Sequence, residues 1–507
     1  MAGPHPEPTF DAAPDARDPA ARREFLRRFA CGFGGVAAGA IAAADAARSP
    51  VSAATGSPEG SLAHSGLHHP PRAKRVIFLF MQGGVSQVDS FDHKAELQTR
   101  DGQKMPFDDA RTIAKTGMRG SEQRLMASPW SFRQYGESGR AVSELFPETA
   151  RHVDDLCFLH GMHTDGVAHG PATLFLHCGS TNFVRPSLGA WTLYGLGTDN
   201  ENLPGFVSIS PPIGNGGPRN YGSAFLPAHF QGTPIGVAGE ERLAIENLVR
   251  DRAVAGGGPA GPGGNLGDQR EQFALLKSLG QQQLRRRAMA HAELDAALES
   301  YELAWRMQQV APEILDFADE SPQTLAEYGI DDPTTRGYGK KCLLARRLCE
   351  AGVRFIQVNY GDNSANPAWD QHSNLPKHAD HARAVDKPIA ALLGDLKRRG
   401  LLDDTIVWWG GEFGRTPYSQ NNGTGRDHNP GGFTVWLAGG GFRPGMAYGE
   451  TDEFGFAALR GKVHMHDLHA TLLHQLGIDH RRLTYRHAGR EFRLTDVYGR
   501  VIRDVLT

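Results

Sequence analysis

The sequence predicts an α/β fold in which a mainly parallel β-sheet is flanked by helices on both faces. Continuous apolar runs of strand length occupy residues 75–81, 353–360 and 405–409. Such runs are typical of parallel strands that are covered on both faces. Segments with helical periodicity, 338–351 and 378–400, precede the second and third runs. This alternation of strand and helix favours parallel pairing of the strands.

The composition is that of an ordinary globular protein. Of the 507 residues, 40% are apolar and 22% are charged, with a formal net charge of −3. This charge gives no electrostatic reason to expect nucleic acid or an anionic membrane surface as a partner. The five cysteines show no CxxC spacing, so buried thiols are expected, although export would allow Cys157 to pair with Cys178, or Cys342 with Cys349. The oligomeric state is left open.

The N-terminal region predicts export. Residues 1–21 are rich in Pro, Asp and Ala and are expected to be disordered. The pair Arg22-Arg23 begins a segment, 22–47, that resembles a twin-arginine signal peptide, although a basic helix cap beside an Ala-rich tail is the alternative. We therefore expect the twin-arginine export machinery as a partner and a periplasmic or cell-surface location. Residues 48–72 are expected to form a linker.

The expected α/β domain spans residues 73–507 and opens with the first apolar run. That run ends in a glycine turn, Gly83-Gly84, after which Ser86 is suited to cap a short helix. Around 200–330 the chain is first rich in Pro and Gly and then strongly helical, which predicts an insertion or cap. The other expected elements are a helix over 147–155, a strand over 156–162, a helix from Ala172, a strand over 433–438 and a helix over 463–478.

Carboxylates and imidazoles gather where two of the predicted strands end. Asp370 and His372 follow the strand at 353–360, whereas Glu412 and then His428 follow the strand at 405–409. Ligand sites in open α/β sheets lie at the carboxyl ends of the strands, and these groups are ligands of zinc, manganese and iron. A site for one or two divalent metal ions is therefore expected. The alternative is that these groups only hydrogen-bond one another to close long loops.

Five short motifs carry a family resemblance: GGVSQVD, HTDGVAHGPA, WDQHSN, GEFGRTP and GRDHNP. Together they resemble the exported bacterial family called domain of unknown function 1501, within the alkaline phosphatase and sulfatase superfamily. The resemblance covers roughly residues 65 to 505. It implies a parallel α/β sheet with metal ions bound at the strand ends. One superfamily metal site then falls on Asp370, His372 and His428, and looks intact.

The second superfamily metal site is altered in this chain. The resemblance places Gln82, Glu412, Phe413 and His169 at its positions. Phenylalanine offers no lone pair to a metal, and a glutamine amide is a poorer ligand than a carboxylate. Glu412 with His169 is expected to form a changed second site, or else His169 acts as nucleophile or general base.

Arg415 is expected to hold a phosphate or sulfate oxygen, because a guanidinium presents a planar fork of donors. A structural ion pair between Arg415 and Glu412 is the alternative. The predicted function is metal-assisted hydrolysis of phosphate or sulfate esters, on a small-molecule or polysaccharide substrate. The competing hypothesis is an exported binding or assembly protein that keeps the fold and has lost catalysis.

Overall fold

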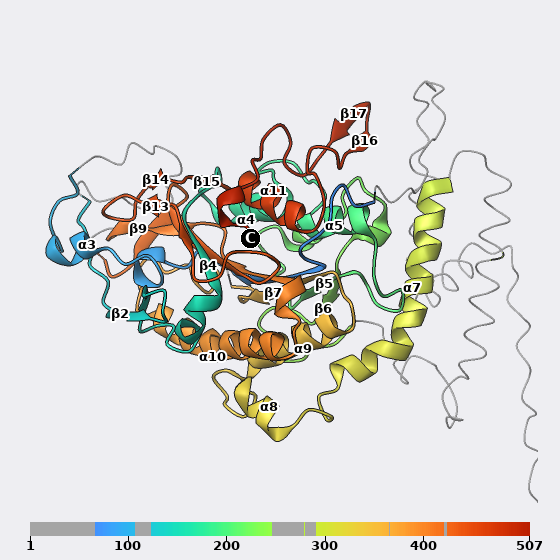
Figure 1. Cartoon of the computed structure of the whole chain (residues 1–507), viewed down its shortest axis with the longest axis horizontal. Coiled ribbons are helices and arrows are strands. Elements are labelled where there is room, and N and C mark those ends of the chain that lie inside the picture. Colours follow the sequence, from blue (N-terminus) through green and yellow to red (C-terminus); the bar gives the residue numbers. More distant parts are fainter. Residues whose placement is uncertain (1–65, 107–122, 246–277, 279–290, 365, 420–422) are drawn as a thin grey trace, which may run out of the picture. The chain divides into compact units, whose positions relative to one another are not determined.

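A mixed, mostly parallel sheet forms the centre of the part of the chain that the computed structural model describes. Among the described residues, nine strands pair in this sheet, and β11 is antiparallel to both of its neighbours. The sheet confirms the predicted α/β fold class (Figure 1). In spatial order its strands are β12 (Ala447–Tyr448), β4 (Leu156–His163), β11 (Phe433–Ala438), β8 (Thr405–Gly410), β1 (Arg75–Met81), β7 (Phe355–Tyr360), β5 (Phe206–Ile209) and β6 (Thr233–Ile235), with β15 (Val463–His464) also paired to β4.

The description covers residues 66–106, 123–245, 278, 291–364, 366–419 and 423–507. The predicted disordered terminus, the twin-arginine segment and most of the linker lie outside these residues, as does much of the helical stretch before residue 291. Within the described residues, no helix has the length and apolar character needed to cross a membrane.

Helices cover both faces of the sheet, as the sequence predicts. Figure 1 shows α9 (Arg336–Glu350) and α10 (Lys377–Arg398) on one face, and α4 (His169–Cys178), α5 (Leu188–Leu196) and α11 (Met465–Gln475) on the other. Alternate residues of each strand point to opposite faces, so the two faces of the sheet contribute side chains to two separate apolar cores. In β1, Ile77 and Leu79 join the core under α9 and α10, whereas Phe78 and Phe80 join the core under α4, α5 and α11.

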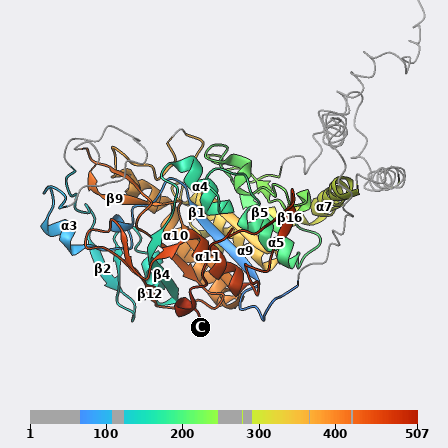
Figure 2. The ribbon, with the colours of Figure 1, turned by 90° about the horizontal axis from the view of Figure 1, so that it is seen from above.

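Among the remaining described elements, α3 (Ala95–Thr99) and α7 (His291–Leu315) lie toward opposite ends of the sheet (Figure 2). The sequence predicts a cap around 200–330, but β5 and β6 of this region join the edge of the central sheet. The helix predicted over 147–155 is a 3-10 helix, η2. The other elements are η1 (Gln87–Asp89), α3 (Ala95–Thr99), β2 (Phe132–Tyr135), β3 (Arg140–Ser143), η2 (Thr149–Asp155), η3 (Gly217–Asn220), η4 (Ala228–Phe230), α7 (His291–Leu315), α8 (Pro322–Glu327), η5 (Leu402–Asp404), β9 (Gly414–Ser419), β10 (Arg426–Asn429), β13 (Glu450–Thr451), β14 (Ala458–Arg460), β16 (Tyr485–His487), β17 (Arg490–Phe492) and η7 (Arg503–Val505).

A buried ion pair anchors the β9–β10 hairpin beside the end of β1. Arg426 Nε lies 2.7 Å from Asp89 Oδ2, and Arg426 Nη2 lies 3.0 Å from Asp89 Oδ1. Both side chains are fully buried. The Ser86 hydroxyl donates to Asp89 Oδ2 at 2.5 Å, so Ser86 does not serve as the side-chain cap that its position suggests. The pair fixes the strand that carries His428.

We expect Asp89→Asn to destabilise the fold by about 3–5 kcal/mol, because it leaves the Arg426 guanidinium buried without a counter-charge. The free energy of unfolding from urea denaturation measures this. Arg151→Gln is the control, because it breaks an exposed pair with Glu148 and should change stability little. Equal losses of unfolding free energy in the two variants would contradict the stabilising role of the Asp89–Arg426 pair.

Candidate metal centre

Four ligand-type side chains meet at the carboxyl edge of the central sheet. His169 is the first residue of α4, which follows β4. Asp370 and His372 lie in the loop after β7, and His428 lies on β10. One ligand atom from each of these four residues lies within 4.8 Å of all the others. Segments far apart in the sequence thus bring three imidazoles and a carboxylate together.

Three imidazole nitrogens surround one oxygen of Asp370. The distances to Asp370 Oδ1 are 2.8 Å from His372 Nε2, 3.2 Å from His169 Nε2 and 3.3 Å from His428 Nε2. His372 Nε2 and His428 Nε2 are themselves 3.0 Å apart. The buried His169 Nε2 makes no hydrogen bond, although it lies close to the carboxylate.

Hydrogen bonds on the far side of two rings determine which nitrogen faces the cluster with a lone pair. His169 Nδ1 lies 2.6 Å from Glu412 Oε1, and His428 Nδ1 lies 2.7 Å from the Val167 carbonyl oxygen. Both oxygens only accept hydrogen bonds, so each Nδ1 carries the proton and donates it. In the neutral ring, Nε2 then presents a lone pair.

The third ring also has a carboxylate on its far side, but at a longer distance. His372 Nδ1 lies 3.8 Å from Asp427 Oδ1, on the side away from Asp370. Three Nε2 atoms and a carboxylate oxygen therefore converge, and hydrogen-bond acceptors stand behind the His169 and His428 rings. A set of lone pairs at this spacing is stabilised by a cation among them. Backing of ligand histidines by carboxylates or carbonyls is typical of protein metal sites.

Glu412 stands behind His169. Its side chain is fully buried, and both of its oxygens accept from the Gly83 backbone N–H, at 3.0 and 3.1 Å. Since Oε1 also accepts from His169, Glu412 is not in the group of four. His169, expected as a catalytic residue or as part of a changed second site, lies among the four ligand-type groups, and Glu412, an expected ligand, lies behind its ring.

Arg415 does not match the expected substrate clamp. Its side chain has no exposed surface and pairs with Asp370, where Nη2 lies 2.7 Å from Oδ1. Its other donors reach backbone carbonyls, including those of Gly84 at 3.0 Å and Arg426 at 3.1 Å. A substrate has no access to this guanidinium. Arg415 instead joins Asp370 to the turn after β1 and to β10, and its ion-pair partner is not Glu412.

Burial and neighbouring charges set the protonation of the cluster. Burial lowers the pKa of His428 to about 3, so this ring is neutral. Burial opposes ionisation of Asp370, but the close imidazoles of His169, His372 and His428 and the charge of Arg415 hold the pKa of this carboxyl far below its usual value. Burial also acts to lower the pKa of His169, yet the nearby carboxylates of Asp370 and Glu412 outweigh this and raise it, so a bound metal ion would have to compete with a proton at this ring.

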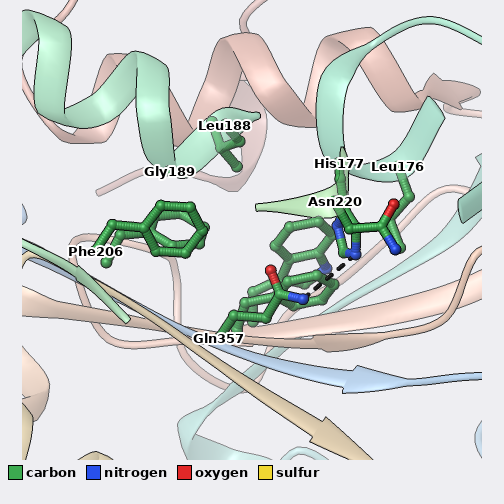
Figure 3. Close-up of a pocket in the computed structure, with 10 residues that line it drawn as sticks. Leu176, His177, Leu188, Gly189, Phe206, Asn220 and Gln357 are labelled. Atoms are coloured by element: carbon green, nitrogen blue, oxygen red, sulfur yellow. Dashed lines mark hydrogen bonds between the residues drawn. The ribbon is translucent and has the colours of Figure 1, made fainter. Parts of the chain in front are cut away.

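The four residues fit a divalent metal ion. Imidazole nitrogens with one carboxylate oxygen suit zinc, iron and manganese. The His372 side chain is 27% exposed and the His169 side chain 12%, so the cluster can be reached from solvent. The small cavity in Figure 3 lies elsewhere: Phe78, His177 and Gln357 line it, and none of the four residues does.

Sequence reasoning grouped Asp370, His372 and His428, and the structure brings them together. The Val167 carbonyl, which accepts from His428 Nδ1, was not predicted. Ionisable side chains that gather after a predicted strand can be recognised by their residue types. A backbone carbonyl leaves no such signal in a sequence.

Solved structures with related architecture have low similarity to this chain. A sulfatase, PsFucS1 from Pseudoalteromonas sp., is 11% identical with a TM-score of 0.33, covering 80% of this chain and 68% of that one. The phosphonate monoester hydrolase SpPMH from Silicibacter pomeroyi is 12% identical with a TM-score of 0.30, covering 71% of each. TAB5 alkaline phosphatase, a mutant with Mg bound, is 11% identical with a TM-score of 0.31, covering 80% and 98%. With TM-scores below 0.5, none of them bears on activity.

A comparison with curated proteins finds no match. The family described as "Protein of unknown function (DUF1501)" matches residues 73–506, nearly the whole described chain. This match confirms the family resemblance predicted from the five motifs. The chain belongs to the DUF1501 family.

Proposed function

We propose that this protein binds at least one divalent metal ion and hydrolyses a phosphate or sulfate ester there. His169, Asp370, His372 and His428 would hold the ion. The observation that supports this is the convergence of three Nε2 atoms on Asp370 Oδ1, with the Nδ1 atoms of His169 and His428 turned to acceptors. When bound, a divalent ion supplies Lewis acidity that polarises an ester oxygen and acidifies water.

The chain's own residues prepare the site for such a reaction. Glu412 and the Val167 carbonyl fix the His169 and His428 rings, and Arg415 fixes Asp370. α4 begins at His169, so the positive end of its macrodipole lies at the centre and favours an anionic ester. Since both nitrogens of His169 are engaged by this arrangement, we do not assign it the role of nucleophile.

A second candidate function is binding or assembly without catalysis. Phe413 and Gln82 stand at positions where the superfamily resemblance calls for ligands, and Arg415 is out of reach of a substrate. These departures favour a chain that keeps the fold, with or without a metal ion, but has lost catalysis. The two candidates differ in the hydrolysis of model esters.

We also propose that the chain is exported through the twin-arginine machinery to the periplasm or cell surface. The Arg22-Arg23 segment, 22–47, supports this location. The division of the chain that we propose with it is an N-terminal segment at 1–21, the signal peptide at 22–47, a linker at 48–72 and the α/β domain at 73–507. A small-molecule or polysaccharide ester is the substrate class that suits this location.

The folded protein should contain metal, and an Asp370→Ala/His372→Ala variant should lose it, because two of the four ligand groups are gone. Elemental mass spectrometry after loading with zinc or manganese measures the content. Hydrolysis of 4-nitrophenyl phosphate and 4-nitrophenyl sulfate, measured on the same samples, should disappear with the metal.

His487→Ala is the matched control, because His487 is an exposed histidine on the β16–β17 hairpin, outside the cluster. It should keep both metal and hydrolysis. Metal without hydrolysis would select the binding role. A wild-type protein that takes up no metal would overturn the hydrolase and leave the binding or assembly role.

Glu412→Gln should weaken metal affinity about 10–100-fold, as changes behind ligand histidines generally do. With its oxygen at the place of Oε1, the neutral amide loses the negative charge behind His169 and turns its N–H₂ toward the Gly83 N–H. With the amide turned the other way, its N–H₂ faces His169 Nδ1 and favours the other tautomer of that ring. Competition with a chromogenic chelator measures affinity, and the ¹⁵N shifts of the imidazole report the tautomer without metal. An unchanged affinity and tautomer would contradict the role given to Glu412.

A further inference from the structure

The Phe413 side chain forms an apolar wall of the metal centre. Its ring lies 4.4 Å from the His428 ring and 5.0 Å from the His169 ring, between centroids. The central carbon of the Arg415 guanidinium lies 5.9 Å from the Phe413 centroid. At 1% exposure, Phe413 is buried among these groups. The space beside Glu412 and His169 is therefore occupied by an aromatic ring.

The turn after β1 holds this ring in place. Gly84 has φ +77°, and a Cβ added there would lie 2.7 Å from the Phe413 ring. The backbone of the turn thus packs directly on the ring, which only glycine allows. The same turn is tied to Glu412 through Gly83 N and to Arg415 through the Gly84 carbonyl. Phe413 cannot move aside unless these contacts also break.

The described residues contain no second set of ligands around this ring. The cluster of His169, Asp370, His372 and His428 is the one group of three or more metal-ligating side chains that they form. The oxygens of Glu412 already accept from Gly83 N and His169. Gln82 contributes only a neutral amide, and phenylalanine contributes no lone pair.

We propose that the centre holds a single metal ion, because Phe413 fills the place in which a second ion would meet Glu412. This inference rests on the proposed metal function and sets its number of ions. Two-metal hydrolases hold the attacking and leaving oxygens between ions roughly 3.5–4 Å apart. A chain with one ion lacks that clamp, so its ester must be oriented by the single ion and by the protein around it.

The test is the metal stoichiometry of the full-length protein, measured by equilibrium dialysis and elemental mass spectrometry with Zn²⁺ and Mn²⁺ separately. One equivalent is expected for each metal, with the electron paramagnetic resonance spectrum of an isolated Mn²⁺ ion. Two equivalents, with the broadened spectrum of coupled ions, would overturn this inference and leave the proposed function standing. No bound metal would overturn both.

Variants at position 413 test whether the Phe413 ring is what excludes a second metal ion. Phe413→Asp should raise the stoichiometry above one, because it replaces the ring by a carboxylate next to Glu412. Phe413→Leu, the matched control, keeps the position apolar and should stay at one equivalent. Phe413→His provides a neutral ring with a ligand nitrogen if the aspartate variant does not fold, as judged by circular dichroism. A stoichiometry of one in every folded variant would overturn the role of Phe413.

Discussion

The candidate metal centre depends on the buried carboxylate of Asp370 and its ion pair with Arg415. It carries a negative charge inside the protein, and Arg415, itself without exposed surface, supplies the opposing charge at 2.7 Å. Removing one partner of such a pair leaves an uncompensated buried charge, which is strongly destabilising. Because Arg415 also holds the turn after β1 and the backbone of β10, one guanidinium sets the mutual position of the segments that carry Asp370 and His428.

Much of the fold could be predicted from hydrophobic patterns. The runs at 75–81, 405–409 and 433–438 form strands that are buried on both faces. Each is a continuous apolar run of strand length, so it can be recognised from the sequence alone. β5 and β6 were not predicted, since strands of four and three residues between Gly and Pro give too short a pattern. Their strand conformation depends on pairing within the sheet: β5 pairs with β7, and β6 pairs with β5.

The sequence predicted which residues meet at the candidate site better than it predicted what each of them does there. The spacing of Asp370 and His372 and the position of His428 after a strand indicate ligand types, which a sequence records. The roles of His169, Glu412 and Arg415 depend on burial and on which ring nitrogen faces inward, and a sequence records neither. The Arg415 guanidinium could bind an anion, but here it donates hydrogen bonds to the backbone carbonyls of the Gly83-Gly84 turn.

In the proposed centre, three Nε2 atoms and Asp370 Oδ1 surround a metal ion. Anomalous diffraction at the zinc edge, from crystals of the zinc-loaded protein, would locate the ion. We expect a peak bounded by His169, His372, His428 and Asp370, with the Nδ1 atoms of His169 and His428 still turned to Glu412 and the Val167 carbonyl. Folded, loaded protein with no peak there, or with its peak beside Glu412 and Gln82, would contradict it.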